Sequence, residues 1–290
     1  MSPRVAVAVD EIDWHTRDLL RAFSERGVHA AAVRLSACTF DSTTPTGLVV
    51  PGFGALPDAM LVRAIEPGSF EQVTRRLGIL HALRELGVMV MNDARAIERC
   101  VDKSTTTFLI ARAGLPTPPS WTVDNIEAAR SIAARELGNG ALVLKPLFGS
   151  QGRGLRLIKR EEDLPEAEAV GGVYYLQRFL RSPAKPFLDH RLFVCDGKVI
   201  GAMTRRANAW VTNITRGGIP EPLIPTDRMI ELALAAAAVV GAAYAGVDLL
   251  PDEDGLSVLE VNSMPGWHGL QAVTAMSISA KIAMALCNRI

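Results

Sequence analysis

The sequence predicts an α/β (α+β) protein, with a parallel sheet at its N-terminal end and hairpin-rich segments after it. In the first third, short apolar runs alternate with amphipathic stretches, the pattern of strand–helix–strand units. Further along, turn signals such as Asp196-Gly197 separate pairs of apolar runs, which is typical of antiparallel hairpins. Of the 290 residues 49% are hydrophobic, enough for sizeable cores, and the length suggests about two domains.

The N-terminal third is expected to hold four strands and two helices. The first helix contains Leu19 and Phe23 and ends at Gly27. The second begins at Ser69, which precedes Gln72 at the spacing of a capping box. Strands joined by helices in this way should build one parallel sheet. The expected strands are 5–9, 29–35, 48–51 and 88–91.

The rest of the chain is expected to combine helices with three hairpins. A capping box of Asp124 and Glu127 opens a helix that stops at Gly138. The other expected helices are 93–101, 102–113, 228–243 and 271–287, and the hairpins pair 142–145 with 155–158, 192–195 with 198–203, and 246–250 with 257–261.

Charge and cysteine content narrow the class of protein. Lys and Arg total 31, as do Asp and Glu, so the net charge is 0, whereas proteins that bind nucleic acid through its phosphates normally carry a basic excess. We therefore expect no nucleic-acid partner. The four cysteines are far apart, which favours a reduced, cytoplasmic protein. The most apolar stretch, 232–247, is shorter than the roughly 20 residues of a bilayer span, and the first residues do not read as a signal peptide, so we expect no membrane association.

Several common catalytic patterns are absent from the sequence. Gly52-Phe53-Gly54 follows an expected strand, but Pro57 stands where a dinucleotide-binding fingerprint needs its last glycine. The phosphate-loop and nucleophile-elbow motifs are missing, and the histidines do not fall at zinc-ligand spacing. The remaining candidates are three groups of charged and polar residues.

The first group is a set of oxygen-bearing side chains near the C-terminal end. Asp248, Glu260 and Asn262 lie within otherwise apolar strands. Residues two apart on a strand share a face, so Glu260 and Asn262 point the same way, and pairing across the 251–256 turn can set Asp248 opposite Glu260. Two carboxylates and an amide oxygen suit Mg²⁺. The alternative is a hairpin whose acids simply face solvent.

The second group is a glycine-rich loop with two lysines. Residues 149–154 read Gly-Ser-Gln-Gly-Arg-Gly, and three glycines allow backbone amides to approach a phosphate closely. Lys145, at the end of the preceding strand, supplies positive charge, and Lys103 is a second candidate cation. Alternatively, the glycines serve only a hairpin turn and Lys103 is a surface group at a helix start.

The third group is basic and contains Arg191, Arg205, Arg206 and Arg216. If the strands pair regularly across the Asp196-Gly197 turn, Arg191 and Arg206 lie on the same sheet face. Two arginines there would neutralise a transferring phosphoryl group or hold a carboxylate. The alternative is a solvated, charged sheet edge.

In this order the segments resemble an ATP-grasp ligase of the RimK-type branch, which joins glutamate to carboxylates. The matching motifs cover residues 100–270 almost without a gap. The N-terminal third, through 62–73, 80–83 and 94–98, is similar to one subgroup, the tetrahydromethanopterin:α-L-glutamate ligases. The motifs are Val101-Asp102-Lys103, Leu144-Lys145-Pro146 with Gly149 to Gly154, Tyr175 to Leu180, Asp189-His190-Arg191, Arg205-Arg206-Ala207, Asn213 to Gly218, Ala245 to Leu250 and Glu260 to Gly266.

The resemblance implies an ATP-grasp fold that clamps ATP, with a parallel-sheet domain at 1–92, a subdomain bearing the glycine loop at 93–180 and a subdomain bearing the metal site at 181–290. ATP and a pair of Mg²⁺ ions, which Mn²⁺ could replace, are the implied cofactors. Each matching residue also acquires an implied role. The phosphates would be contacted by Lys103, Lys145, Gly149, Ser150, Gln151 and Gly152. The adenine would be lined by the backbone of Gln177, Arg178 and Phe179, with Asp189 toward the ribose. Mg²⁺ would be held by Asp248, Glu260 and Asn262, and the reacting groups would be faced by Arg191, Arg206 and Asn213.

Two positions depart from the family pattern. Relatives usually carry a glutamate where Arg178 stands, a change that a main-chain contact to adenine tolerates. Their loop corresponding to 208–213 is usually longer and ends in Arg-Ser-Asn, whereas this chain ends it in Val211-Thr212-Asn213. Because that loop lies near the expected acceptor site, the acceptor is the least determined feature.

The expected reaction forms an amide bond through an acyl phosphate. The acceptor's carboxylate attacks the γ-phosphate of ATP, and the amino group of L-glutamate then displaces phosphate from the acyl carbon. The resemblance implies a small-molecule acceptor such as a tetrahydromethanopterin-like pterin, and a homo-oligomer, dimer or tetramer. The alternatives are a glutamate ligase acting on a protein C-terminus or on a furan- or deazaflavin-type acid, and an ATP-binding regulatory module, which the intact metal set disfavours.

Overall fold

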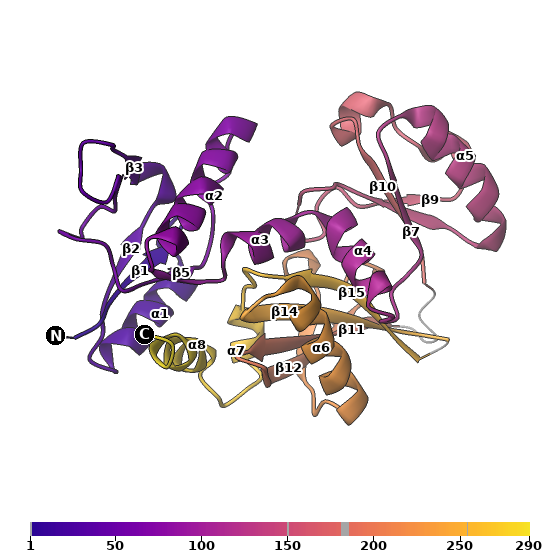
Figure 1. Ribbon diagram of the computed structural model, residues 1–290. Helices are drawn as coiled ribbons and strands as arrows, with labels where there is room; N and C mark the ends of the chain where they lie inside the picture. The colour runs from indigo at the N-terminus through magenta and orange to yellow at the C-terminus, as the bar shows by residue number, and fades with distance from the viewer. Residues whose placement is uncertain (1, 150, 181–185, 254) are drawn as a thin grey trace.

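In a computed structural model, which describes residues 2–149, 151–180, 186–253 and 255–290, the chain begins with a parallel sheet in the order β2-β1-β5-β6 (Figure 1). The apolar side chains of β1 alternate between the two faces of the sheet. Val5 and Val7 pack against α1 (Trp14–Ser24), and Ala6 and Ala8 pack against α2 (Phe70–Glu85). The expected capping box of Ser69 opens the second helix. The elements are β1 (Arg4–Ala8), α1 (Trp14–Ser24), β2 (His29–Val33), β5 (Ala59–Val62), α2 (Phe70–Glu85) and β6 (Met89–Met91).

The third strand of this sheet is β5, so the expectation of a strand at 48–51 in the parallel sheet is wrong. β4 (Leu48–Val49) instead pairs with β3 (Thr39–Phe40) in a two-stranded antiparallel ribbon. Every residue of β5 is buried, which suits a central strand. Its sequence, Ala-Met-Leu-Val, contains only one β-branched residue and therefore does not distinguish strand from helix.

The middle of the chain forms an antiparallel sheet in the order β7-β10-β8-β9. α5 covers one face of it, with Ala129, Ile132 and Ala133 packed on buried residues of the strands. That helix is capped by Asn125 rather than by the expected Asp124. The elements are α3 (Ala94–Val101), α4 (Lys103–Arg112), β7 (Ser120–Val123), α5 (Ile126–Glu136), β8 (Leu142–Lys145), β9 (Arg156–Ile158) and β10 (Tyr174–Arg178).

The last part of the chain forms a five-stranded antiparallel sheet in the order β13-β12-β11-β14-β15. α6 packs on one of its faces. The helix expected at 271–287 begins later, after its N-cap Ser277, and the short helix before it ends at Gln271. The elements are β11 (Phe187–Cys195), β12 (Lys198–Ala207), β13 (Ile219–Pro222), α6 (Asp227–Val240), β14 (Tyr244–Asp252), β15 (Gly255–Asn262), α7 (His268–Gln271) and α8 (Ile278–Cys287).

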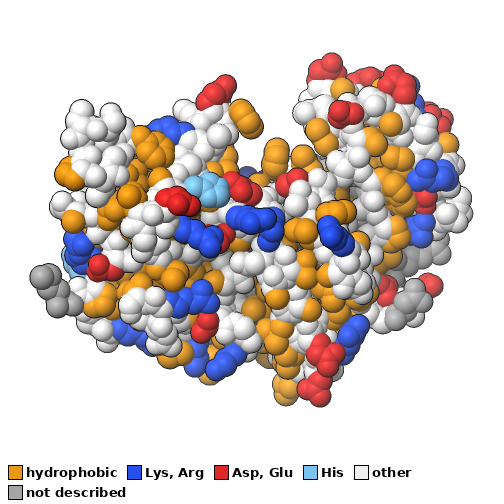
Figure 2. Space-filling model, viewed as in Figure 1, with side chains coloured by type: hydrophobic (Ala, Val, Ile, Leu, Met, Phe, Trp, Pro, Cys, Tyr) orange, Lys and Arg blue, Asp and Glu red, His pale blue; other side chains and the backbone are white. Residues whose placement is uncertain are grey.

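The N-terminal sheet is fixed to the C-terminal sheet by a shared core. α8 returns to pack beside α1 (Figure 1), and Phe193, Tyr244 and Trp267 join the same apolar cluster. Buried Asn92 donates hydrogen bonds of 2.7 Å to the carbonyls of both Tyr244 and Ser263. The space-filling view shows a hollow between the N-terminal part and the part that carries α5 (Figure 2). Among the described residues, no helix is long and apolar enough to cross a bilayer.

Candidate active site

A cavity lies between the two antiparallel sheets and gathers most of the residues singled out in the sequence. β8 and β10 supply one wall, and β11, β12, β14 and β15 supply the opposite one. Of the predicted residues, Ser150 lies outside the described part of the chain, and Arg191, Arg206 and Asn262 are not among those lining this cavity. The predicted residues that line it are Lys103, Lys145, Gly149, Gln151, Gly152, Gln177, Arg178, Phe179, Asp189, Asn213, Asp248 and Glu260.

Two lysines bring positive charge to one end of this cavity. Lys145 is the last residue of β8 and is buried, and burial lowers its pKa to about 8. Lys103 is the first residue of α4, where Asp102 caps the helix, and burial lowers its pKa as well. Its Nζ donates to the carbonyls of Leu147 (3.3 Å) and Gly149 (2.8 Å). Two partly desolvated cations at one site favour an anionic ligand.

The glycine loop closes against the 208–213 segment. Gly152 has a φ of +66°, in the left-handed region that favours glycine. A Cβ at this position would lie 2.6 Å from Oδ1 of Asn213 and 2.7 Å from Cγ1 of Val211. The structure therefore brings the predicted loop and Asn213 together over the cavity, with no space between them for a larger residue.

The expected pairing of Asp248 with Glu260 is confirmed. These residues face each other across β14 and β15, and Nδ2 of Asn262 donates to Oε1 of Glu260 at 3.0 Å. Asp248 is fully buried, and burial alone would raise its pKa, but the guanidiniums of Arg191 and Arg205 hold that pKa well below its usual range. Arg191 donates to both oxygens of Asp248 at 2.7 Å, and Arg205 approaches one of them at 2.8 Å.

The donor set fits a hard divalent cation. The Glu260 side chain is 30% exposed, and with the amide of Asn262 it presents the oxygen ligands that Mg²⁺ prefers. Among the described residues, no three His, Cys, Asp or Glu side chains form a metal-binding group. Asp248, the third predicted ligand, has both carboxylate oxygens engaged by Arg191 and one of them also by Arg205.

The expectation that Arg191 and Arg206 share a sheet face is wrong, because a bulge intervenes. The register of β11 and β12 shifts by one residue between Phe193 and Val194. A one-residue shift sends every side chain beyond it to the opposite face. Arg205 therefore shares the face of Arg191, while Arg206 projects from the other face and pairs with Glu221 at 3.0 Å.

The remaining wall combines an engaged acid with aromatic groups. Both oxygens of Asp189 accept hydrogen bonds from Arg205, one of them from Nε at 2.7 Å. Phe179 contacts Trp210 edge to face with ring centroids 5.8 Å apart, and both rings line the cavity. The backbone N–H of Arg178 donates to the carbonyl of Pro119 at 2.8 Å, so this donor is already engaged.

Sequence reasoning missed two residues of this site for different reasons. Arg205 was recognised only as one of several basic residues, because its face depends on the bulge. Trp210 lies in an irregular segment, where the two-residue periodicity that assigns a face does not apply. In the same segment, Asn213 was recognised because it begins the motif Asn-Ile-Thr-Arg-Gly-Gly.

The cavity lies between two antiparallel sheets, with carboxylates and arginines on one wall and a glycine loop beside two lysines. This arrangement is that of the class of ATP-grasp ligases. Solved structures agree. The ATP-grasp ligase PsnB in complex with a minimal precursor superposes with a TM-score of 0.76 at 22% identity, covering 100% of this chain and 99% of that one. D-cycloserine synthetase DcsG gives 0.73 at 20% identity, covering 99% of each chain.

The chain belongs to the RimK-like ATP-grasp family, whose model matches residues 100–286. It is 33% identical to a tetrahydromethanopterin:α-L-glutamate ligase of Methanosarcina acetivorans, over 92% of this chain and 93% of that one. It is also 30% identical to a probable α-L-glutamate ligase of Cellvibrio japonicus, over 93% and 90% of the two chains. The protein is an ATP-grasp ligase.

Proposed function

We propose that this ligase joins the amino group of L-glutamate to the carboxylate of a small acceptor, a tetrahydromethanopterin-like pterin, with conversion of ATP to ADP. The observation that carries the proposal is that two cavities meet at one wall, formed by Lys103, Lys145 and Glu260. A nucleotide in the first cavity and an acceptor in the second would then meet at the charged groups. The names of the relatives support glutamate as the amine and a pterin as the acceptor.

ATP would occupy the first cavity with its base at the aromatic end. Phe179 and Trp210 offer faces and edges to an adenine, and the backbone of 177–179 borders the same space. Lys103 and Lys145 would contact the phosphates, and the glycine loop would cover them. Asp189 acts on this arrangement through Arg205, because both of its oxygens bind that guanidinium.

In the first step an oxygen of the acceptor carboxylate bonds to the γ-phosphorus of ATP as the bond to the bridging oxygen of ADP breaks. An acyl phosphate and ADP result. Negative charge gathers on the transferring phosphoryl oxygens, and Lys145 with Arg191 and Arg205 would offset it from fixed positions. Glu260, Asn262 and Asp248 would hold Mg²⁺, which supplies charge neutralisation when bound.

In the second step the amine nitrogen of L-glutamate bonds to the acyl carbon, and phosphate leaves with the electron pair of the carbon–oxygen bond. The nitrogen loses its extra proton, and an amide remains. Direct attack on a free carboxylate would require oxide as the leaving group, which is why the carboxylate must first be phosphorylated. No covalent enzyme intermediate is needed, so the mechanism does not require a nucleophilic side chain.

The test is ADP release with Mg²⁺-ATP and L-glutamate, measured with a tetrahydropterin, a furan-type acid, a deazaflavin and a peptide as separate acceptors, with products identified by mass spectrometry. We expect ADP and a glutamyl adduct with the pterin alone. An adduct only on the peptide would replace the acceptor that we propose, and ADP release without glutamate incorporation would exclude glutamate as the amine.

Three finer points follow the same proposal. We infer a pair of Mg²⁺ ions, which Mn²⁺ can replace, by analogy with the family; Glu260 borders both cavities, Asp248 the first and Asn262 the second. We place the reaction in the cytoplasm, where ATP is available, in keeping with four cysteines that are free in the structure. We also infer a homo-oligomer, which light scattering coupled to size-exclusion chromatography would test.

A further inference from the structure

A second cavity extends from the shared wall toward the N-terminal sheet. It has a volume of about 460 Å³ and is bordered by Lys103, Lys145 and Glu260 on one side and by Arg63 on the other. Its charged lining thus consists of three cations and one anion, which favours an anionic occupant. Apolar side chains cover much of the remainder and suit a hydrocarbon portion of the ligand: Ala64, Ile65, Pro67, Val101, Leu259, Val261 and Met264.

Arg63 is a partly buried cation with one nitrogen left unpaired in the described part of the chain. It directly follows the fully buried strand β5, and its side chain is 13% exposed. Its Nε is buried and has no hydrogen-bond partner among the described residues. Its ion pair with Asp13 spans 3.5 Å from Nη2 to Oδ2, longer than the roughly 2.7–2.9 Å of a charge-assisted hydrogen bond. A buried charge left in this state is costly, so it requires an explanation.

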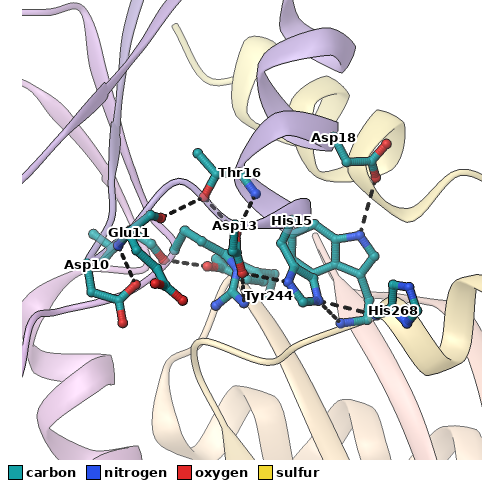
Figure 3. A network of polar contacts seen from close by, with 11 residues as sticks. Asp10, Glu11, Asp13, His15, Thr16, Asp18, Tyr244 and His268 are labelled. Carbon is teal, nitrogen blue, oxygen red and sulfur yellow. Dashed lines mark hydrogen bonds and ion pairs between the residues drawn. The ribbon is translucent and has the colours of Figure 1, made fainter.

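The neighbouring groups that the structure describes fix the position of Arg63 but give its Nε no hydrogen-bond acceptor. Its guanidinium carbon lies 5.4 Å from the ring centroid of Trp267. Asp13 accepts from Nδ1 of His15 at 2.8 Å, and Nε2 of His15 accepts from the backbone N–H groups of Trp267 (3.1 Å) and His268 (3.3 Å) (Figure 3). The Asp13 carboxylate is therefore committed to the cap of α1 and to His15. This arrangement fixes the position of the guanidinium beside the second cavity, which Arg63 lines.

We propose that Arg63 binds a substrate carboxylate that is not activated during the reaction, an inference that rests on the proposed function. The acyl phosphate would form at the shared wall, beside the lysines. Arg63 borders the same cavity on the side of the N-terminal sheet, where a second, unreacting carboxylate requires a counter-charge. A planar guanidinium matches the two oxygens of a carboxylate better than an ammonium group does.

Either substrate can supply this carboxylate. Incoming L-glutamate brings two carboxylates that do not react, and the acceptor can carry a carboxylate besides the one that is phosphorylated. The chemistry at Arg63 is the same in both cases, so direct binding measurements must separate the two sources.

The experiment is isothermal titration calorimetry of the full-length protein with Mg²⁺ and a non-hydrolysable ATP analogue, using L-glutamate and tetrahydromethanopterin as separate ligands. We expect Arg63→Met to weaken the binding of one of them by about 10- to 100-fold, and Arg63→Lys to recover part of the loss. Arg34→Met is the matched control, since Arg34 is 64% exposed, pairs with Glu66 at 3.3 Å and lines neither cavity. It should leave both affinities unchanged.

The outcomes are distinct. Weaker binding of L-glutamate assigns the carboxylate to the amino acid, and weaker binding of the pterin assigns it to the acceptor. Unchanged affinities for both ligands, or no binding of either ligand by the unmutated protein, would overturn the proposal. The melting temperature of Arg63→Met should not fall, because methionine fills similar space without an unpaired buried charge; a large fall with unchanged affinities would make Arg63 structural only. If L-glutamate binds through Arg63 but no acceptor yields ADP, the proposed function fails while this site stands.

Discussion

The ion pairs on the two faces of the C-terminal sheet differ in burial. On the face toward the first cavity, the side chains of Arg205 and Asp248 are 3% and 2% exposed and contact each other at 2.8 Å. On the opposite face, α6 covers an apolar surface, and Arg206 pairs with Glu221 where both side chains are about 40% exposed, at 39% and 41%. Neighbouring residues of one strand thus belong to two different electrostatic environments.

The difference shows that position in the sheet, rather than residue type, decides what an arginine contributes. A buried guanidinium between two carboxylates balances charges that would otherwise be costly, and it remains beside the reacting groups. An exposed ion pair is screened by water and contributes little. The bulge at Phe193 and Val194 assigns each arginine to its face.

Removal of Arg205 should have the largest effect. Arg205→Met leaves Asp189 and Asp248 buried without their shared partner, so we expect a loss of about 3–5 kcal/mol in the free energy of unfolding. Turnover should fall by about 10²–10³-fold in the fraction that stays folded, because a fixed charge near the phosphoryl group is lost. Urea unfolding and ADP release measure the two effects. A stable variant with normal turnover would contradict the role assigned to this face.

The metal-facing carboxylate should separate turnover from stability. Glu260→Gln keeps an oxygen that can accept from Nδ2 of Asn262 but removes a charge. We expect turnover to fall by at least ~100-fold, equivalent to about 3 kcal/mol of transition-state stabilisation, with little change in melting temperature. ADP production across a Mg²⁺ titration measures this. Glu253→Gln, in the exposed turn of the same hairpin, is the matched control and should be nearly silent.

The sequence predicted the fold well where the local pattern was unambiguous. The capping box at Ser69 formed as expected, and the hairpins around Asp196-Gly197 and the 251–256 turn formed with one register shift in each. β5 was missed because a short apolar run with a single β-branched residue does not reveal its periodicity. The contact of α8 with α1 is a long-range packing event, to which no local pattern corresponds.

The site depends on two register shifts that regular strand pairing does not predict. Asp248 faces Glu260 only because the register shifts between Asp248 and Leu249, whereas a regular hairpin would set Asp248 opposite Leu259. The choice between Arg205 and Arg206 depended on one inserted residue, whose position the sequence does not mark. Arg63 follows an unrecognised strand and reaches the second cavity only when the N-terminal and C-terminal sheets pack together, so no spacing rule could assign it.

The burial of Lys145, which lines the first cavity, predicts two pH effects of opposite sign. In the unfolded chain this lysine holds its proton to its ordinary pKa of 10.5, whereas in the folded protein it loses the proton at about 8. The unfolded state therefore binds more protons between these values, so its contribution makes the metal-free protein more stable as pH rises from about 8 to 10.5. Affinity for ATP should fall over the same interval, because an uncharged amine attracts phosphate weakly.

Urea unfolding and nucleotide titration between pH 7 and 10 measure the two effects, and Lys145→Met should abolish the contribution of this residue to both. If the difference in stability between this variant and the unmutated protein does not change with pH, Lys145 keeps its ordinary pKa in the folded state.

The smallest effect is expected for Arg206, and it tests the comparison most directly. Arg206→Met removes an exposed pair with Glu221 on the face away from the first cavity, so turnover, the KM for ATP and the melting temperature should remain close to those of the unmutated protein. Arg206 is next to Arg205 in β12, so the two variants have the same amino-acid composition and opposite expected outcomes. Steady-state ADP release and thermal unfolding, measured side by side, decide between them. If Arg206→Met loses as much turnover as Arg205→Met, the register shift between Phe193 and Val194 does not hold in solution, because a regular hairpin would place Arg206 on the same sheet face as Arg191.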